Sequence, residues 1–193
     1  RKNGTMKNPN LKIKIVRDDK EKEGIIEDNV TIKGKVSVGK GTRIKSGAYI
    51  EGPAMIGKDC TIGPNCFIRN HVTLGNGVRV GNSVELKNTV IFDNTYVPHL
   101  SYLGDSVIAS GINFGAGAVL TNLRFDDKNI KVRVNGNLVN TGRRKFGAVI
   151  GDDVKFGSNV VVNPGRKIGK GAFIHPGVVV YEDVGEGEEY DGK

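Results

Sequence analysis

Two cations spaced eighteen residues apart, Arg69 and Lys87, are the first residues in the sequence with an evident chemical use. If both side chains lie on one face of the fold, about one strand spacing apart, they repel each other unless an anion sits between them. A cation pair of this kind suits a phosphomonoester. The alternative is a solvated ladder of charges that Glu51 partly neutralises, and both interpretations stay open at this point.

A histidine twelve residues after Lys87 is the second candidate. His99 lies in a segment, 96–105, where an otherwise regular pattern is interrupted, and functional residues concentrate on loops held by a rigid scaffold. An imidazole titrates near neutral pH and suits removal of a proton from an ammonium or hydroxyl group; a structural role fits equally well. His71 and His175 occupy ordinary outward positions, and no two histidines are closely spaced, so no metal site is predicted.

A repeat of six residues would position these side chains. Large apolar residues recur at every sixth position from Ile26 to Phe92, and a smaller or β-branched residue follows each of them four positions later. Three such units, folded as the sides of a triangle, give an 18-residue coil whose strands pair from coil to coil at about 4.8 Å. The sequence therefore predicts an all-β solenoid, a parallel β-helix, in which Cys60 and Cys66 fill small inward positions.

The period is interrupted twice along the chain. It is lost between Pro98 and Val107 and again after Leu120, and a last block ends at Val180. The second interruption contains a predicted β-hairpin, 129–139, which turns at an Asn-Gly pair.

The interruptions and the ends divide the chain into segments. The hairpin lies in a basic insertion of about 124–145, interpreted as an arm for oligomer contacts or a lid over anionic ligands. The β-helix is predicted over 25–181, after a charged linker or leader at 1–24. An acidic C-terminal tail at 182–193 is predicted to be frayed.

Composition and charge narrow the class of partner. The 193 residues carry a formal net charge of +8, which points to phosphate ligands, nucleic acid or acidic lipid. A nucleic-acid surface usually combines basic groups with stacking aromatics, whereas aromatics make up 6% of this chain. Small phosphorylated ligands are favoured, with no nucleic acid or membrane as partner.

No secretory or membrane-length apolar run occurs, so a cytoplasmic location with free thiols is expected. Because the chain begins with Arg, we interpret it as part of a longer protein.

Five motifs follow one another in an order that resembles a known family. They are Gly-Asn-Ser-Val-Glu-Leu-Lys (81–87), His-Leu-Ser-Tyr-Leu-Gly-Asp (99–105), Asn-Phe-Gly-Ala-Gly (113–117), Thr-Asn (121–122) and Ile-Gly-Asp-Asp-Val (150–154). The repeat resembles the left-handed parallel β-helix of the hexapeptide-repeat acyltransferase superfamily, whose hand is an exception to the usual crossover rule. The motifs resemble the acetyltransferase domain of bifunctional glucosamine-1-phosphate acetyltransferases/N-acetylglucosamine-1-phosphate uridylyltransferases, and the long insertion is similar to that of archaeal sugar-phosphate nucleotidylyltransferase-acetyltransferases.

The resemblance implies a role for each residue that matches a family motif. His99 matches the general base, and Ala116 matches a main-chain contact near the acetyl group. Ser158 matches a coenzyme A contact, and Pro176 replaces a small residue that lines the coenzyme A path. The phosphate cations are matched by Arg69, Lys87 and Lys145, and the sugar contacts by Tyr102, Asn113 and Asn122. Glu85 belongs to a motif but receives no role.

The activity implied is acetyl transfer from acetyl-CoA to the 2-amino group of glucosamine-1-phosphate or a related amino-sugar 1-phosphate, by a homotrimer and without a metal. The family's nucleotidylyltransferase domain is absent from the sequence. One alternative is therefore a non-catalytic β-helix that trimerises or regulates an attached nucleotidylyltransferase. A second is an acyltransferase with another acceptor, such as galactosamine-1-phosphate or a nucleotide-linked sugar.

Overall fold

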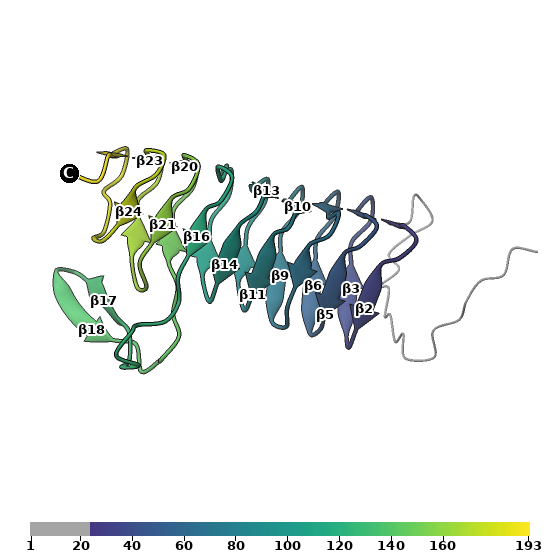
Figure 1. The fold of residues 1–193 in the computed structure, drawn as a ribbon, viewed down its shortest axis with the longest axis horizontal. Coiled ribbons are helices and arrows are strands. Elements are labelled where there is room, and N and C mark those ends of the chain that lie inside the picture. Colours follow the sequence, from purple (N-terminus) through teal and green to yellow (C-terminus); the bar gives the residue numbers. More distant parts are fainter. Residues whose placement is uncertain (1–23) are drawn as a thin grey trace, which may run out of the picture.

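The computed structural model describes residues 24–193, which form strands and turns without a helix (Figure 1). No segment of this range is therefore a helix that could cross a membrane. The predicted segment 1–24 lies outside the described residues except for Gly24.

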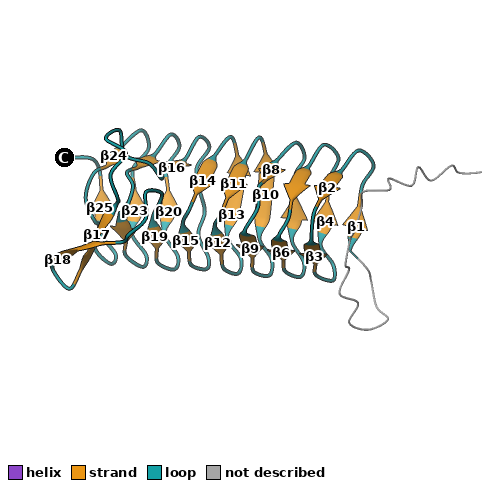
Figure 2. Cartoon of the chain, turned by 90° about the horizontal axis from the view of Figure 1, so that it is seen from below, coloured by secondary structure: helices purple, strands orange, loops and turns teal. Residues whose placement is uncertain are grey.

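Three parallel sheets form the faces of an elongated prism (Figures 1 and 2). The first face contains β1 (Ile25–Ile26), β4 (Arg43–Ile44), β7 (Thr61–Ile62), β10 (Arg79–Asn82) and β13 (Tyr96–His99), and Asn113 links it by single bridges to β20 (Lys155–Phe156), β23 (Phe173–Ile174) and β25 (Glu189–Tyr190). The second face contains β2 (Thr31–Lys33), β5 (Tyr49–Glu51), β8 (Phe67–Ile68), β11 (Glu85–Lys87), β14 (Tyr102–Gly104), β16 (Val119–Leu120), β21 (Val161–Val162) and β24 (Val179–Val180). The third face contains β3 (Val36–Val38), β6 (Ala54–Ile56), β9 (Val72–Leu74), β12 (Val90–Ile91), β15 (Val107–Ile108), β19 (Val149–Ile150) and β22 (Lys167–Ile168).

The six-residue period builds the first coils as predicted. Parallel partners are separated by one full coil of three units, as in Ile44 with Ile62, and the large aliphatic of each unit points into the prism. Ile44, Ile50 and Ile62 have no exposed surface. Cys60 and Cys66 are free and buried in small inward positions, which confirms them as core residues.

The coil becomes one residue shorter at an earlier point than the sequence suggested. Leu74 pairs with Ile91, so Ile91 is the inward residue, 1% exposed, whereas Phe92 is 50% exposed. The prediction that Phe92 closes the inward series is therefore wrong. No loop leaves the prism between 98 and 107 either, because β13 and β14 continue the first and second faces there.

Buried hydroxyl groups accompany the shortened coils. Thr89, Thr95, Ser101 and Ser106 occupy successive small inward positions and are at most 3% exposed. Each hydroxyl lies within hydrogen-bond distance of a backbone carbonyl. Three of them also accept from a backbone N–H of the next coil. Buried polar groups are costly unless paired in this way.

The insertion forms the predicted hairpin. β17 (Lys131–Val134) and β18 (Asn137–Asn140) pair antiparallel, and both turn residues have positive φ, 46° at Asn135 and 81° at Gly136, as an Asn-Gly hairpin turn requires. Ile130, 1% exposed, anchors the base of the insertion against Gly165, where a Cβ would lie 2.7 Å from its side chain.

The acidic C-terminal segment continues the solenoid instead of fraying. β25 pairs with β23, and Val184 and Tyr190 are 4% and 7% exposed. The sequence prediction missed this coil because these two inward side chains stand among acidic residues and glycines.

Candidate functional site

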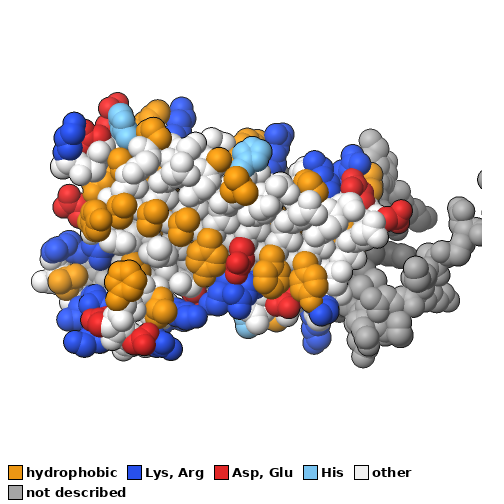
Figure 3. Space-filling view, viewed as in Figure 1, with side chains coloured by type: hydrophobic (Ala, Val, Ile, Leu, Met, Phe, Trp, Pro, Cys, Tyr) orange, Lys and Arg blue, Asp and Glu red, His pale blue; other side chains and the backbone are white. Residues whose placement is uncertain are grey.

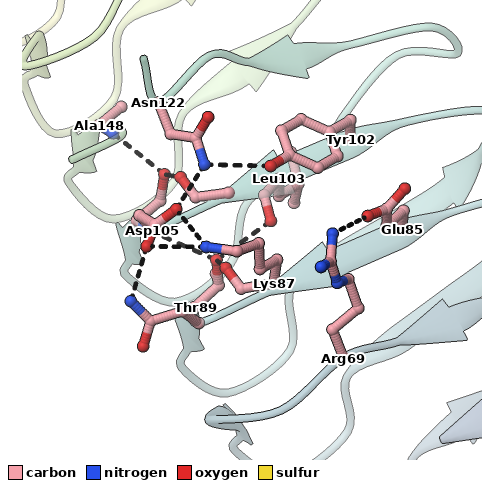
Figure 4. Close-up of polar contacts among 12 residues, drawn as sticks. Arg69, Glu85, Lys87, Thr89, Tyr102, Leu103, Asp105, Asn122 and Ala148 are labelled. Carbon is pink, nitrogen blue, oxygen red and sulfur yellow. Dashed lines mark hydrogen bonds and ion pairs between the residues drawn. The ribbon is translucent and has the colours of Figure 1, made fainter. Parts of the chain in front are cut away.

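A polar network lies at the corner where the second face turns into the third (Figure 4). The Nζ atom of Lys87 lies 3.0 and 3.2 Å from the two carboxylate oxygens of Asp105. The side chains are 17% and 7% exposed, so water screens this ion pair less than it screens an exposed one. The structure thus supplies Lys87 with a carboxylate partner from the next coil.

Asp105 also accepts hydrogen bonds from two amides. Asn88 Nδ2 donates at 2.7 Å, and Asn122 Nδ2 donates to Asp105 Oδ2. Burial acts to raise the pKa of Asp105, but the hydrogen bonds from Asn88, Lys87 and Asn122 outweigh it and hold the pKa below its ordinary value. The group is therefore a carboxylate, and it can only accept.

The network ends at Tyr102, whose hydroxyl accepts from Asn122 Nδ2 at 3.0 Å. Burial raises the pKa of Tyr102, so the phenol keeps its proton. Gly104 leaves room for both groups, because a Cβ there would lie 2.5 Å from the Tyr102 hydroxyl and 2.7 Å from Asn122 Nδ2. Lys87, Tyr102 and Asn122, predicted from separate motifs, are thus brought together.

Arg69 does not face an unpaired Lys87. Its guanidinium lies 3.0 Å from a carboxylate oxygen of Glu85 and 5.7 Å from the centre of the Phe67 ring. Because each cation already has its own acidic partner, repulsion between Arg69 and Lys87 does not by itself require a bound anion, and the phosphate site stays a prediction. Glu85, which had no role, is the partner of Arg69.

His99 lies at the other edge of the second face, on the corner shared with the first face. It ends β13 and is exposed. Gly117 N–H donates to the His99 carbonyl, and Asn159 N–H donates to the Ala116 carbonyl. This puts His99 and Ala116 on successive coils of one corner.

The same corner continues to Ser158 and Pro176. Gly177 N–H donates to the Ser158 carbonyl, and a Cβ on Gly157 would lie 2.4 Å from the Pro176 nitrogen. We call His99, Ala116, Ser158 and Pro176 the corner column. Within residues 24–193 the Ala116 N–H makes no hydrogen bond, whereas Gly115 N–H donates to the Phe156 carbonyl.

Two predicted residues lie apart from the network. Asn113 is exposed on the first face, bridged between Tyr96 and Lys155. Lys145 is exposed at the base of the insertion, where its backbone pairs with Leu123. Since Phe146 N–H donates to the Asn122 carbonyl at 3.1 Å, Lys145 lies next in the chain to a direct neighbour of the network.

Sequence reasoning missed Asp105, Asn88 and Gly104. A signal for Asp105 was available, because it closes the 99–105 motif and lies eighteen residues after Lys87.

Between the corner column and the polar network, Figure 3 shows a row of apolar side chains along the second face. They include the partly exposed Tyr49, Phe67, Val119 and Val161.

Comparisons with known proteins give two matching family models. The one described as the GMPPB C-terminal domain matches residues 50–163, and the bacterial transferase hexapeptide model, six repeats, matches residues 147–182. Among solved structures, the Francisella novicida UDP-N-acetylglucosamine acyltransferase has a similar fold, with a TM-score of 0.60 at 19% identity over 83% of this chain and 62% of that one.

Curated relatives extend beyond the present sequence. A Sulfurisphaera tokodaii protein named bifunctional sugar-1-phosphate nucleotidylyltransferase/acetyltransferase is 54% identical over 165 residues, 86% of this chain and 41% of the relative. A Methanococcus vannielii bifunctional protein GlmU is 47% identical over 88 residues, 46% of this chain and 21% of the relative. The chain thus spans less than half the length of these relatives.

Proposed function

Because the chain belongs to the GMPPB C-terminal domain family, whose model matches residues 50–163, we propose an activity from its site and its named relatives. The proposed activity is transfer of an acetyl group from acetyl-CoA to the 2-amino group of glucosamine-1-phosphate or a related amino-sugar 1-phosphate. The observation that carries it is the Lys87–Asp105–Asn122–Tyr102 network. It combines a cation with sugar-type hydrogen-bonding groups beside an apolar face. The name of the Sulfurisphaera relative supports the reaction class.

In the proposed reaction, His99 acts on the attacking amine and Ala116 acts on the oxyanion. The neutral amine attacks the thioester carbonyl while the His99 imidazole accepts the proton that the nitrogen loses. The Ala116 N–H, unpaired within residues 24–193, donates to the oxyanion of the tetrahedral intermediate. Collapse of the intermediate breaks the C–S bond, and the departing thiolate takes the proton from His99.

The remaining residues orient the two substrates. Lys87, Arg69 and Lys145 hold the phosphate and so aim the amine at the thioester. Tyr102, Asn113 and Asn122 contact the sugar, and Ser158 and Pro176 line the path of coenzyme A along the corner column. A cytoplasmic location, where acetyl-CoA is at hand, accords with this chemistry.

A homotrimer is part of the proposal. The corner column and the polar network lie at opposite edges of one face in a single chain. A site shared between copies would bring the column of one copy to the network of another. It would also cover the apolar row that runs along the second face (Figure 3).

The test is free-thiol release from acetyl-CoA by the 193-residue chain. Glucosamine-1-phosphate, galactosamine-1-phosphate and a nucleotide-linked amino sugar are compared at equal concentration. We expect the highest kcat/KM with an amino-sugar 1-phosphate, and the ratio between the two epimers identifies the acceptor. A chain that binds no acetyl-CoA, and whose removal from the longer protein destroys assembly, would instead be the non-catalytic trimerising or regulatory domain.

A further inference from the structure

The carboxylate of Asp105 has no free acceptor capacity. It accepts two hydrogen bonds from Lys87 and one each from Asn88 and Asn122, and a carboxylate has about four acceptor positions. Its side chain is 7% exposed. Asp105 is therefore unable to bind a substrate directly, and any contribution it makes must act through its neighbours.

The carboxylate determines which way the Asn122 amide faces. An ionised carboxylate has no proton to give, so the Asn122 atom beside it has to be Nδ2, and Oδ1 points away from Asp105 (Figure 4). The same Nδ2 donates to the Tyr102 hydroxyl. The phenol therefore keeps its own proton for another acceptor. Within residues 24–193 neither that proton nor Asn122 Oδ1 has a partner.

We propose that Asp105 is a positioning residue that fixes the hydrogen-bond polarity of the sugar site, leaving Tyr102 to donate and Asn122 Oδ1 to accept. This inference rests on the proposed function. A ligand group that satisfies both must accept one hydrogen bond and donate another, which a hydroxyl or a neutral amine does. The attacking amine needs its lone pair for the thioester carbon, so the group is a hydroxyl of the acceptor sugar.

The decisive variant exchanges the two partners, Asp105→Asn with Asn122→Asp. The exchange keeps the net charge and keeps a hydrogen bond between positions 105 and 122, with its direction reversed. Position 122 then only accepts, so the Tyr102 proton turns inward and the site presents acceptors alone. We expect kcat/KM for the amino-sugar phosphate to fall on the order of 100-fold, while KM for acetyl-CoA stays close to wild type. The melting temperature should fall, because Lys87 loses its ion pair with the carboxylate at position 105.

Tyr102→Phe completes a double-mutant cycle. If the exchange acts through the Tyr102 proton, it causes no further loss of kcat/KM in a chain that already carries Tyr102→Phe. Asp183→Asn is the matched control, because Asp183 also pairs with a lysine, Lys167 at 3.8 Å, but lies on another part of the prism. Wild-type kcat/KM in the exchanged chain, or independent losses in the cycle, would overturn the inference.

Deoxy analogues of the acceptor test the same inference without the exchanged chain. The analogue that lacks the hydroxyl held between Tyr102 and Asn122 Oδ1 should have a lower kcat/KM than the full acceptor with the wild type. With Tyr102→Phe, the analogue and the full acceptor should have the same kcat/KM. Equal losses in both proteins would contradict the inference. A wild-type chain that releases no thiol with any amino-sugar phosphate would overturn the proposed function itself. An active wild type with an equally active exchanged chain would overturn only the inference about Asp105.

Discussion

Two stretches of the same solenoid, the regular coils (residues 25–86) and the short coils (residues 87–123), differ by one residue per turn. In the regular coils, Ile44 pairs with Ile62. In the short coils, Tyr102 pairs with Val119, a partner one residue closer along the chain. Among the small inward positions of the regular coils, Thr42 is the one hydroxyl residue. The short coils place four hydroxyl residues in succession there.

The missing residue comes from the corner between the second and third faces. Inward residues are five apart at Leu86 and Ile91 and again at Leu103 and Ile108. Asn88 and Asp105 occupy these tight corners with φ of 47° and 50°, a conformation that Asn and Asp tolerate better than most residues. Shortening thus aims Asp105 at Lys87, and the insertion after Asn122 leaves from the same corner. The regular coils form a uniform prism, and the short coils carry the Lys87–Asp105–Asn122–Tyr102 network.

The largest expected effect is the loss of turnover on replacing His99 of the short coils, compared with replacing His71 of the regular coils. His99→Ala should lower kcat for thiol release by about 10²- to 10⁴-fold, because it removes the proposed general base. His71→Ala, at an exposed position of the regular coils, should leave kcat unchanged. Steady-state rates at saturating acetyl-CoA decide the matter, and near-wild-type turnover by His99→Ala would assign the base to another group.

Core truncation should affect the short coils at least as strongly as the regular ones. Phe114 has no exposed surface and stacks on Phe156 with ring centres 4.5 Å apart. Phe114→Ala should lower the free energy of unfolding by about 3–5 kcal/mol, compared with about 2–5 kcal/mol for Ile62→Ala in the regular coils. Guanidinium unfolding at one fixed protein concentration measures both. A loss below about 1 kcal/mol for Phe114→Ala is well under the usual cost of such a truncation. It would mean that the Phe114–Phe156 pair contributes little to the core of the prism.

The buried hydroxyls should matter because they are paired. The Thr89 hydroxyl lies 2.9 Å from the Lys87 carbonyl and accepts from the Ser106 N–H at 3.4 Å. Thr89→Val keeps the shape but leaves these groups unpaired, at a cost of about 1–3 kcal/mol. Thr73→Val is the control, since the Thr73 hydroxyl is half-buried on the outer side of β9 and has no hydrogen bond within residues 24–193. Equal unfolding free energies for the two variants would show that the hydrogen bonds of the Thr89 hydroxyl do not stabilise the short coils.

The same contrast explains which parts of the structure could be predicted from the sequence. A strict period specifies the register wherever a slip would expose the inward side chains, so the inward residues from Ile32 to Leu86 were predicted correctly, although Ile26 at the end of the prism is exposed. The period also pointed to Phe92, because a five-residue side has no signature other than the shift to Ile91. The ion pairs of Arg69 with Glu85 and of Lys87 with Asp105 depend on how the coils stack in space. The column of residues eighteen apart that contains Arg69 and Lys87 continues to Asp105, the partner of Lys87, whereas Glu85, the partner of Arg69, lies outside it.

The smallest effect is expected at the corner beside His99. Leu100 has a φ of 49° and is 63% exposed, whereas Asn29, Gly47, Asn65 and Ser83 of the regular coils hold the left-handed conformation at this corner. A leucine pays about 1 kcal/mol for that conformation, so Leu100→Asn should raise the free energy of unfolding by about that amount, and Asn29→Leu should lower it similarly. Strain retained at an exposed position next to the proposed base indicates use by a ligand or a neighbouring copy. Leu100→Asn should therefore also lower kcat/KM, and a variant that gains stability with full activity would show that the strain serves no function.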